Sequence, residues 1–335
     1  MRFRLRYLVV PLVVAALAAA VLWAIPADGY IYAPDRAKPL AAHVSVPGAH
    51  PTGAGDVYYV DAFIKRASLL ERILPFTRPD GSTLVPADNY LPQGVSARER
   101  ERQVVQEMVR STEIAPAVAL SALGHNVHAR ATGVLVIGVI GGTPAVGKLQ
   151  EGDVIVAVDG KPVRMPLELR AAIGRHRPGQ RVRITVRRGD KTLRMTVGTV
   201  SVKEQPGRPI VGIQVDQAAK IELPVDVKID IGRVGGPSAG LPFALEIARQ
   251  LGRNVTHGCK VAATGELALD GSVLPVGAIK QKTIGVRRAG ASIFLVPVGD
   301  NNAADARANA HGLRILAVNS FQQALRALAA HPPKC

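Results

Sequence analysis

The sequence predicts an α+β protein with a mostly-β module in its middle and one N-terminal transmembrane helix. Three observations predict this: a charge-free apolar N-terminal run, a series of short apolar runs separated by turns within residues 133–200, and an alternating strand followed directly by an amphipathic helix after residue 225. A chain of 335 residues is long enough for two domains and an appendage.

The N-terminal segment reads MRFRLR and then YLVVPLVVAALAAAVLWAIPA. The charge-free run covers 7–27, which at 1.5 Å per residue spans a hydrocarbon core. Three arginines precede it within residues 1–6, and Asp28 follows it. The positive-inside rule therefore places the N-terminus in the cytoplasm and the rest of the chain outside a cell membrane crossed once. The run is longer than the apolar part of a usual signal peptide, so we expect a retained anchor, with cleavage as the alternative.

The composition narrows the classes of partner and cofactor. The formal net charge is +16, but Lys and Arg are spread along the chain without an aromatic-rich basic motif. This favours a solvated basic surface over nucleic-acid binding. Two cysteines, Cys259 and Cys335, are too few for a disulfide framework, although one bridge stays open. His125 and His128 have no further ligands at metal-site spacing, and we expect no metal and no other cofactor.

The middle of the chain reads VLVIGVI, DVIVAVDGKPV and RVRITVRRGDKTLRMTV, with one helical stretch at 167–173. The segment GGTPAVGKL in this region is close to a phosphate-binding P-loop. However, Leu149 stands where a hydroxyl would meet magnesium, Pro144 removes an amide, and a strand rather than a helix follows. We therefore reject nucleotide binding there.

The segment GGTPAVGKLQEGDVIVAVDGKPV resembles the core of a bacterial PDZ domain, and the resemblance covers residues 126–203. PDZ domains bind an extended peptide as an added strand. The resemblance implies a groove between a strand near 133–137 and the helix at 167–173; the alternative is a module that only packs against the rest of the chain. The residues expected to line this groove are Gly133, Val134, Leu135, Val136, Ile137 and Leu167.

Ser238 lies in GGPSAG, between the alternating run VDVKIDI at 225–231 and helical spacing at 241–251. Pro237 suits a first helical turn, and free amides there would face a developing oxyanion. One interpretation is the G-x-S-x-G elbow of α/β-hydrolase esterases, which needs a later acid and then a histidine. The residues in that order are Asp270, Asp300, Asp305 and His311. The elbow also requires a large parallel sheet, which the β-rich module before Ser238 leaves little room for.

The segment TGELALDGSVLPVGAIKQKTIGVRRAG at 264–290, taken with GGPSAG, resembles the α+β proteolytic domain of Lon proteases. With the anchor and the PDZ-like module, the chain resembles membrane-anchored, PDZ-containing Lon-like proteases. The resemblance implies that Ser238 is the nucleophile, that Lys282, the second lysine of IKQK, is its base, and that Thr264 hydrogen-bonds this lysine. Gly236 and Pro237 would support the turn.

The sequence departs from the Lon pattern at one position, because Gly235 stands where an aspartate is common. The departure touches neither Ser238 nor Lys282. A serine hydroxyl is a poor nucleophile until a base takes its proton, and an exposed lysine with a pKa of about 10.4 is already protonated. Burial beside the apolar residues of the 279–286 segment would free the amine. The alternative is that both lysines of IKQK are surface charges.

The resemblance also predicts the domain organisation. We expect a linker, a strand and a long helix interrupted near Pro116 within residues 28–125, then the PDZ domain, then the Lon-type domain at 207–335. The helix and strand before the PDZ domain resemble the start of a Lon proteolytic domain, so the PDZ domain would be inserted into a discontinuous protease domain.

These observations predict an ATP-independent, membrane-anchored serine endopeptidase outside the cytoplasm. It would cleave unfolded or tail-exposed proteins that the PDZ domain recruits. A catalytically inactive PDZ binding scaffold and, less favoured, an esterase are the alternatives. The resemblance alone implies an oligomer, a hexamer as in Lon-type rings. The N-terminal helix would be the contact with the membrane, and no nucleic-acid partner is expected.

Overall fold

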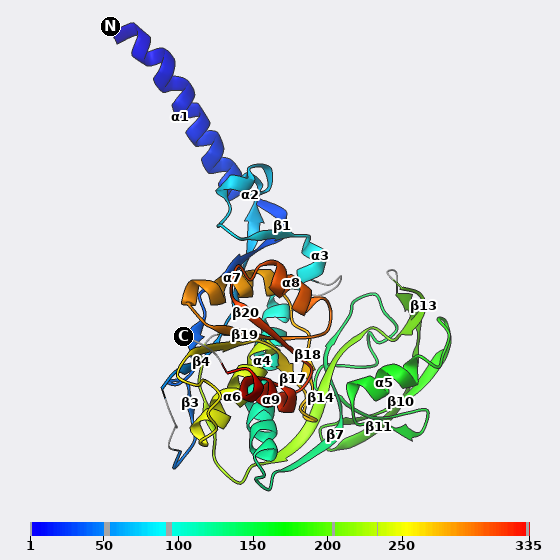
Figure 1. Cartoon of the computed structure of the whole chain (residues 1–335). Helices are drawn as coiled ribbons and strands as arrows, with labels where there is room; N and C mark the ends of the chain where they lie inside the picture. The colour runs from blue at the N-terminus through cyan, green and yellow to red at the C-terminus, as the bar shows by residue number, and fades with distance from the viewer. Residues whose placement is uncertain (1, 50–53, 92–95, 203–204, 233, 333–334) are drawn as a thin grey trace.

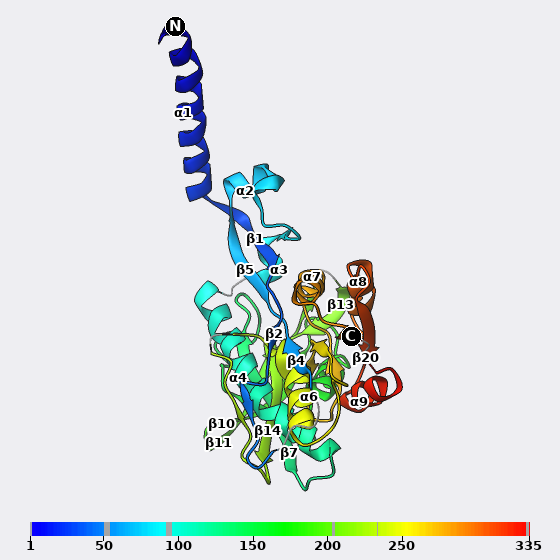
Figure 2. The same ribbon diagram turned by 60° about the vertical axis from the view of Figure 1, so that its left-hand side comes forward.

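The computed structural model describes residues 2–49, 54–91, 96–202, 205–232, 234–332 and 335. Helix α1 (Arg2–Ala24) projects away from the body of the molecule (Figures 1 and 2). The side chains of residues 1–9 lie outside the described part. Among the described residues, none of the helices combines the length and the apolar character that crossing a bilayer requires.

A small antiparallel sheet connects α1 to the body. The order of its strands is β5-β1-β6, and the strands are β1 (Pro26–Pro34), β5 (Ala62–Ser68) and β6 (Thr83–Val85). Three short helices accompany it in the sequence, namely α2 (Leu69–Ile73), η1 (Pro75–Thr77) and α3 (Ala87–Tyr90). Ser68 and Glu71 form a capping box at the start of α2, which satisfies the first free amides of that helix. The start of the segment that we assigned to a linker is therefore a strand.

The body contains a five-stranded sheet of order β2-β4-β16-β19-β20, in which β4, β16, β19 and β20 run parallel. The strands are β2 (Lys38–Pro39), β4 (Asp56–Tyr59), β16 (Lys260–Ala263), β19 (Ile293–Pro297) and β20 (Arg314–Val318). Because β4 and β16 pair, segments on both sides of the β-rich module in the sequence share one sheet.

Helices cover both faces of this sheet. On one face, the largest apolar core contains α4 (Ala97–Ala122), α6 (Gly240–Gln250) and α9 (Phe321–Ala330). On the other face, α7 (Ile279–Ala289) and α8 (Asn302–Ala308) cover a second core. Helix α4 is continuous through Pro116, so the expected interruption there is wrong. The body is a mixed α/β fold.

The middle module has its own apolar core and a sheet of order β11-β10-β8-β7-β14, with β9 paired to β8. Its elements are β7 (His128–Val139), β8 (Val154–Val158), β9 (Lys161–Pro162), α5 (Pro166–Ile173), β10 (Arg181–Arg188), β11 (Lys191–Gly198) and β14 (Ile213–Glu222). The predicted helix and the hairpin turn at Asp159-Gly160 are confirmed, with positive φ at both turn residues.

Short ribbons complete the fold. They are β12 (Val200–Val202) with β13 (Gln205–Ile210), β3 (Val44–Ser45) with β15 (Lys228–Ile229), and β17 (Glu266–Leu267) with β18 (Val273–Leu274). Of the strand that we predicted at 225–231, only Lys228–Ile229 is paired. A single 3-10 turn, η2 (Pro237–Ala239), leads into α6.

Gly285 on α7 offers a test of how closely this helix is packed. A Cβ there would lie 1.9 Å from the Asp35 carbonyl oxygen. In an exposed helix, replacing Gly with Ala stabilises by up to about 1 kcal/mol. We expect Gly285→Ala to have the opposite sign and to lower the free energy of unfolding by about 1–3 kcal/mol, because the backbone must shift.

Denaturant unfolding measures this difference. Lys280→Ala on the exposed face of the same helix is the matched control, with an expected change under about 0.5 kcal/mol. A stabilised Gly285→Ala variant would contradict the close approach of α7 to Asp35.

Candidate active site

Ser238 lies in η2, at the start of the buried helix α6, and is half-buried. The turn before it is held from α4, because the Gly236 amide donates to the Val104 carbonyl (2.8 Å) and the Ser111 hydroxyl donates to the Pro237 carbonyl (3.1 Å). Gly236 has φ of 90°, a conformation that favours glycine. The two predicted supporting residues thus form the turn that presents Ser238.

Packing against α4 explains why a glycine suits position 235. A Cβ at this position would lie 2.3 Å from the Val104 Cγ1 atom. The aspartate that Lon proteases commonly carry at this position would therefore displace Val104 or the turn. Glycine at position 235, where the resemblance led us to expect aspartate, therefore fits the close approach of α4 to the Ser238 turn.

Lys282 lies in the first turns of α7 and is 4% exposed. Its Nζ donates a hydrogen bond to the Thr264 hydroxyl (3.3 Å). Burial lowers the pKa of Lys282 to about 8, and the charge of Asp61 opposes this shift. The prediction of a buried lysine amine beside Thr264 is therefore matched by the structure, whereas Lys280 is exposed.

Thr264 connects the lysine to the serine segment. Its hydroxyl accepts from Lys282 Nζ and donates to the Ser238 carbonyl (3.3 Å), and the Gly265 amide donates to the same carbonyl (2.9 Å). Thr264 itself is fully buried at the end of β16, where its amide donates to the Leu295 carbonyl. A short hydrogen-bonded path therefore runs from the amine through Thr264 to the backbone of Ser238.

Ser238 and Lys282 line one cleft of about 440 Å³. Its walls come from the small β1 sheet, from α3 and α4, and from the segment before α7. Beyond the serine and the lysine, the polar side chains that line it are Tyr32, Asp61, Asn89, Tyr90, Arg100 and Glu107. No histidine is among its described lining residues. His311, required by the esterase interpretation, lies in an exposed turn before β20.

Asp61 is a cleft residue that the sequence analysis missed. It follows β4, and its carboxylate accepts from the Ala62 amide (2.8 Å). Burial raises the pKa of Asp61, while the Ala62 amide and the Lys282 charge oppose the rise. Nothing in the local pattern marks this aspartate, because it reaches the cleft only through the pairing of β4 with β16.

A second group of ionisable side chains lies between the β-rich module and the body. Glu107 pairs with Arg100 (3.0 Å), and Arg110 on α4 pairs with Asp216 on β14. Burial, followed by the charges of Asp216 and Glu107, raises the pKa of Glu266 to about 7, and Arg110 and Arg170 oppose this. Glu266 stands two residues after Thr264, so this group adjoins the loop that positions Lys282.

The structure corrects most of the predicted peptide groove of the module, although the predicted residue Ile137 does line a groove. Val134 and Leu135 pair with β8 on one edge of β7, and the segment from Gly133 to Val136 pairs with β14 on the other, whereas Ile137 lies at an irregularity of this pairing. A strand paired on both edges has no backbone groups left for an added peptide. Val134 and Val136 are fully buried, and Leu167 is 74% exposed at the start of α5.

The observed groove, of about 640 Å³, lies one strand further out. It runs between α5 and the segment that enters β14, and Leu169, Ile173 and Ile213 line it together with Ile137. Strand β14 is the edge of the sheet in the described part of the chain. The sequence resemblance found the module, but the choice of strand needed the three-dimensional strand order.

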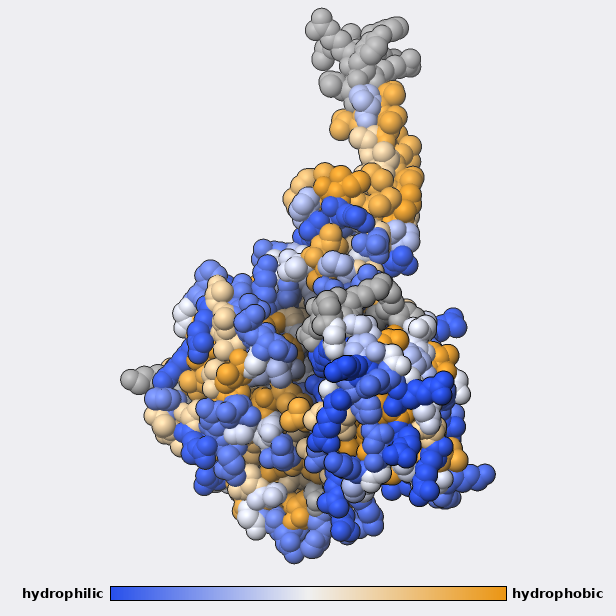
Figure 3. All heavy atoms as spheres, turned by 90° about the vertical axis from the view of Figure 1, so that its right-hand side faces the viewer, coloured by the Kyte–Doolittle hydropathy of each residue, from blue (hydrophilic) through white to orange (hydrophobic). Residues whose placement is uncertain are grey.

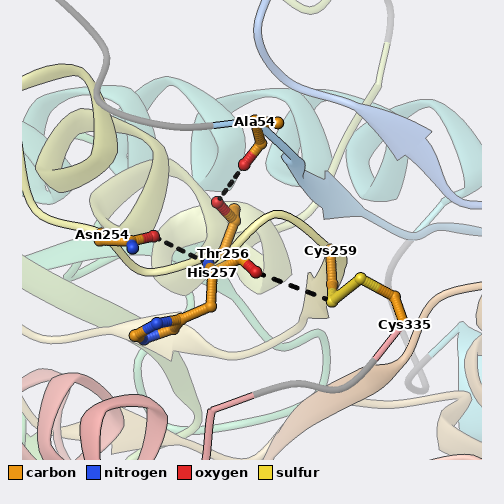
Figure 4. The surroundings of a disulfide bond; sticks show 6 residues. All are labelled: Ala54, Asn254, Thr256, His257, Cys259 and Cys335. Carbon is orange, nitrogen blue, oxygen red and sulfur yellow. Dashed lines mark hydrogen bonds between the residues drawn. A yellow bond between two sulfur atoms is a disulfide. The ribbon is translucent and has the colours of Figure 1, made fainter.

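The structure also bears on the P-loop-like segment, on metal-binding groups and on the two cysteines. The P-loop-like segment at 141–149 forms turns rather than a loop before a helix. Within the described residues, no group of three or more His, Cys, Asp or Glu is arranged to hold a metal ion. Cys259 and Cys335 form a disulfide, which the sequence analysis left open (Figure 4).

Comparisons with protein families identify both parts of the chain. Residues 121–199 match the PDZ domain, and residues 211–329 match the Lon protease (S16) C-terminal proteolytic domain. The chain therefore carries a PDZ domain followed by a Lon-type proteolytic domain. The second match begins just before β14, which nevertheless pairs with the PDZ sheet.

The curated relatives that the chain is similar to include Lon proteases. Lon protease 1 of Sorangium cellulosum is 34% identical over 155 residues, which cover 41% of this chain and 18% of that protein. Lon protease 1 of Bacillus subtilis is 37% identical over 87 residues, covering 26% of this chain and 11% of that protein. The matched region thus spans less than a fifth of the length of these two relatives.

Solved structures are similar to about a quarter of the chain. The PDZ domain of an SdrC-like protein from Listeria monocytogenes is 29% identical and covers 25% of this chain and 87% of that chain, with a TM-score of 0.24. The solution structure of GtR34C from Geobacillus thermodenitrificans gives the same identity and TM-score and is covered to 98%.

Glu266 gives a pH-dependent test of the ionisable group between the domains. Its pKa is raised in the folded chain, so the stability it contributes is complete below about pH 4.5 and is lost as the pH rises through about 7. We expect Glu266→Gln to match the parent chain at pH 4 and to be more stable at pH 8, by at most roughly 3 kcal/mol.

Thermal unfolding at pH 4, 6 and 8 measures the effect. Glu113→Gln on the exposed side of α4 is the control and should leave the pH dependence unchanged. A Glu266→Gln variant that is less stable than the parent at pH 8 would show that the carboxylate is favourably paired rather than strained by burial.

Proposed function

We propose that this chain is an ATP-independent serine endopeptidase in which Ser238 attacks the peptide bond and Lys282 is the general base. The observation that carries the proposal is the buried amine of Lys282, hydrogen-bonded to Thr264 in the same cleft as a serine at a helix start. ATP independence is supported by the fold of the P-loop-like segment as turns.

The lowered pKa makes the lysine usable as a base near neutral pH. With a pKa of about 8, roughly a tenth of the amine is neutral at pH 7, against less than one part in a thousand for an ordinary lysine. As Ser238 Oγ attacks the substrate carbonyl carbon, the neutral Lys282 Nζ takes its proton. The same nitrogen then returns the proton to the leaving amine, and water hydrolyses the acyl-enzyme.

The start of α6 would stabilise the charge on the attacked carbonyl. The amides of Ser238 and Ala239 lie in the first turn after Pro237, where backbone donors have no partner within the helix. They face the positive end of the helix dipole, which favours an oxyanion. The two pre-formed elements, a donor pair and a neutral base, account for peptide-bond cleavage without histidine.

Substrates would be unfolded or tail-exposed polypeptides recruited by the PDZ domain. The groove between α5 and β14 borders a strand edge that no other described strand covers, which suits an extended chain. An oligomer, a hexamer by resemblance to Lon-type rings, stays a prediction that light scattering of the purified chain would test.

Loss of either member of the proposed pair should abolish cleavage. A fragment beginning at Ile25 keeps β1, which starts at Pro26. We expect this fragment to degrade β-casein, and Ser238→Ala and Lys282→Ala to lower the rate by on the order of 10³-fold or more. Lys280→Ala, two positions away on the exposed face of α7, is the matched control and should stay near the parent rate.

Each unexpected outcome of this assay has a meaning. Equal cleavage by all variants would remove the pair from the mechanism. No cleavage by the parent fragment under any condition would favour the binding scaffold. Loss of activity on replacing His311 would favour the esterase-type arrangement.

The pH dependence of kcat/KM should report the lysine. We expect activity to rise with pH and to be half-maximal near pH 8, because the neutral amine is the active form. Asp61→Asn removes a charge that raises the pKa of Lys282, so its profile should move to lower pH. A profile centred between pH 6 and 7 that is unchanged in Asp61→Asn would contradict a lysine base.

We also propose that the chain is anchored in a membrane by its N-terminal segment, with the folded domains outside the cytoplasm. The described side chains of α1 form an exposed, largely apolar stem above a more hydrophilic body (Figure 3). The Cys259–Cys335 disulfide suits an oxidising compartment.

We expect the full chain to stay in the membrane pellet after alkaline carbonate extraction and to be digested by protease added outside intact cells. A carbonate-soluble chain of full length would contradict the anchor.

A further inference from the structure

Among the described strands, only β7 pairs with β14 along the sheet, so the outer edge of β14 has no strand partner where it borders α5. The Gly212 carbonyl accepts from the Ile140 amide, so this residue points toward β7. Because successive residues of a strand point to opposite edges, the backbone groups of Ile213 point away from β7, toward the groove. Ile213 and Val215 pack against the core of the PDZ domain on one face of the strand. An extended chain in the groove would therefore continue the sheet.

Helix α4 of the proteolytic domain forms the far wall of the same groove. Arg100 and Glu107 line the groove together with the α5 residue Arg170. The Arg110–Asp216 ion pair joins α4 to β14 beside it, with both side chains largely buried. The position of α4 along the open edge is thus fixed by a direct contact between the two domains.

The same two α4 residues also line the Ser238 cleft. Arg100 and Glu107, an ion pair at 3.0 Å, are shared by both cavities, and Val104, one turn away, holds the Ser238 turn through its carbonyl. The two cavities therefore adjoin at helix α4.

From this we propose that the PDZ groove and the Ser238 cleft form one continuous channel, in which a single extended substrate polypeptide is held by β14 while a nearby bond of the same segment reaches Ser238. The proposal rests on the peptidase function proposed above. Arg100 and Glu107 form the floor between the two halves and are specificity-determining residues, because substrate side chains that cross α4 meet this ion pair.

The geometry also sets the spacing between the anchored segment and the cleaved bond. A helix with its side chains is roughly 10 Å across, and an extended chain rises about 3.3 Å per residue. Crossing α4 therefore takes on the order of three to six residues. The PDZ domain would therefore fix the cleavage site a few residues from the segment that it binds, rather than hold a distant part of the substrate.

Photo-cross-linking of the full chain carrying Ser238→Ala tests the channel without requiring cleavage. A photoreactive residue replaces Asn89, an exposed residue of the Ser238 cleft, or Arg170, an exposed residue of the groove. The probe is β-casein, and mass spectrometry maps the captured segments. We expect segments captured from the two positions to be neighbours in the casein sequence, offset by a constant number of residues, on the order of the three to six that crossing α4 takes, and always in the same direction.

The matched control replaces Lys191, an exposed residue in the β10–β11 hairpin that lines neither cavity. Scattered offsets, or capture from position 170 no more frequent than from position 191, would overturn the channel. The native chain is then mapped for casein cleavage sites. Constant offsets without any cleavage would leave the channel and remove the peptidase, whereas cleavage with scattered offsets would do the reverse.

Discussion

The arrangement of the cleft depends on one buried cation. Taking a lysine ammonium out of water costs several kcal/mol unless it is paired or loses its proton. Here the amine has a hydroxyl partner in Thr264 and an opposing charge in Asp61, but it is almost fully buried. The close packing of α7 against the Asp35 segment, which leaves room only for Gly285, keeps the amine at that depth. The free-energy cost of burying the Lys282 amine is thus offset by the packing of α7 around Gly285.

The two domains are joined by structure that belongs to both. Strands β7 and β14 form one long antiparallel ribbon (Figure 1), in which Ile213 and Val215 pack on the PDZ core while Ile221 packs on the core of the proteolytic domain. Helix α4 contacts this ribbon and the Ser238 turn at once. The Asp216–Arg110 pair is one of the contacts that tie β14 to α4.

Much of the site was predictable because its signal is local. Ser238, Thr264 and Lys282 were singled out through the resemblance to Lon proteases, because GGPSAG and the 264–290 segment are continuous motifs that can be read without knowing the fold. Asp61 and Ile213 were missed for a different reason. Asp61 lines its cavity because β4 lies beside β16, and Ile213 lines its groove because β14 lies beside β7. Such strand pairing depends on segments that are far apart in the sequence, so a local pattern does not reveal it. The continuity of α4 through Pro116 was likewise decided by packing, because its buried residues on either side of the proline belong to one core.

The packing around Gly235 and the position of Asp61 both bear on which carboxylates reach the cleft. Val104 fills the space beside Gly235, so a carboxylate attached there would displace the contact between α4 and the Ser238 turn. The cleft nevertheless contains carboxylates, and the one whose charge acts on Lys282 is that of Asp61 after β4. Its charge raises the pKa of Lys282 against the larger effect of burial. Without that charge the amine would be neutral over a wider pH range but a weaker base, since proton affinity falls with pKa. A value near 8 therefore reflects a balance between the availability of the neutral amine and its strength as a base.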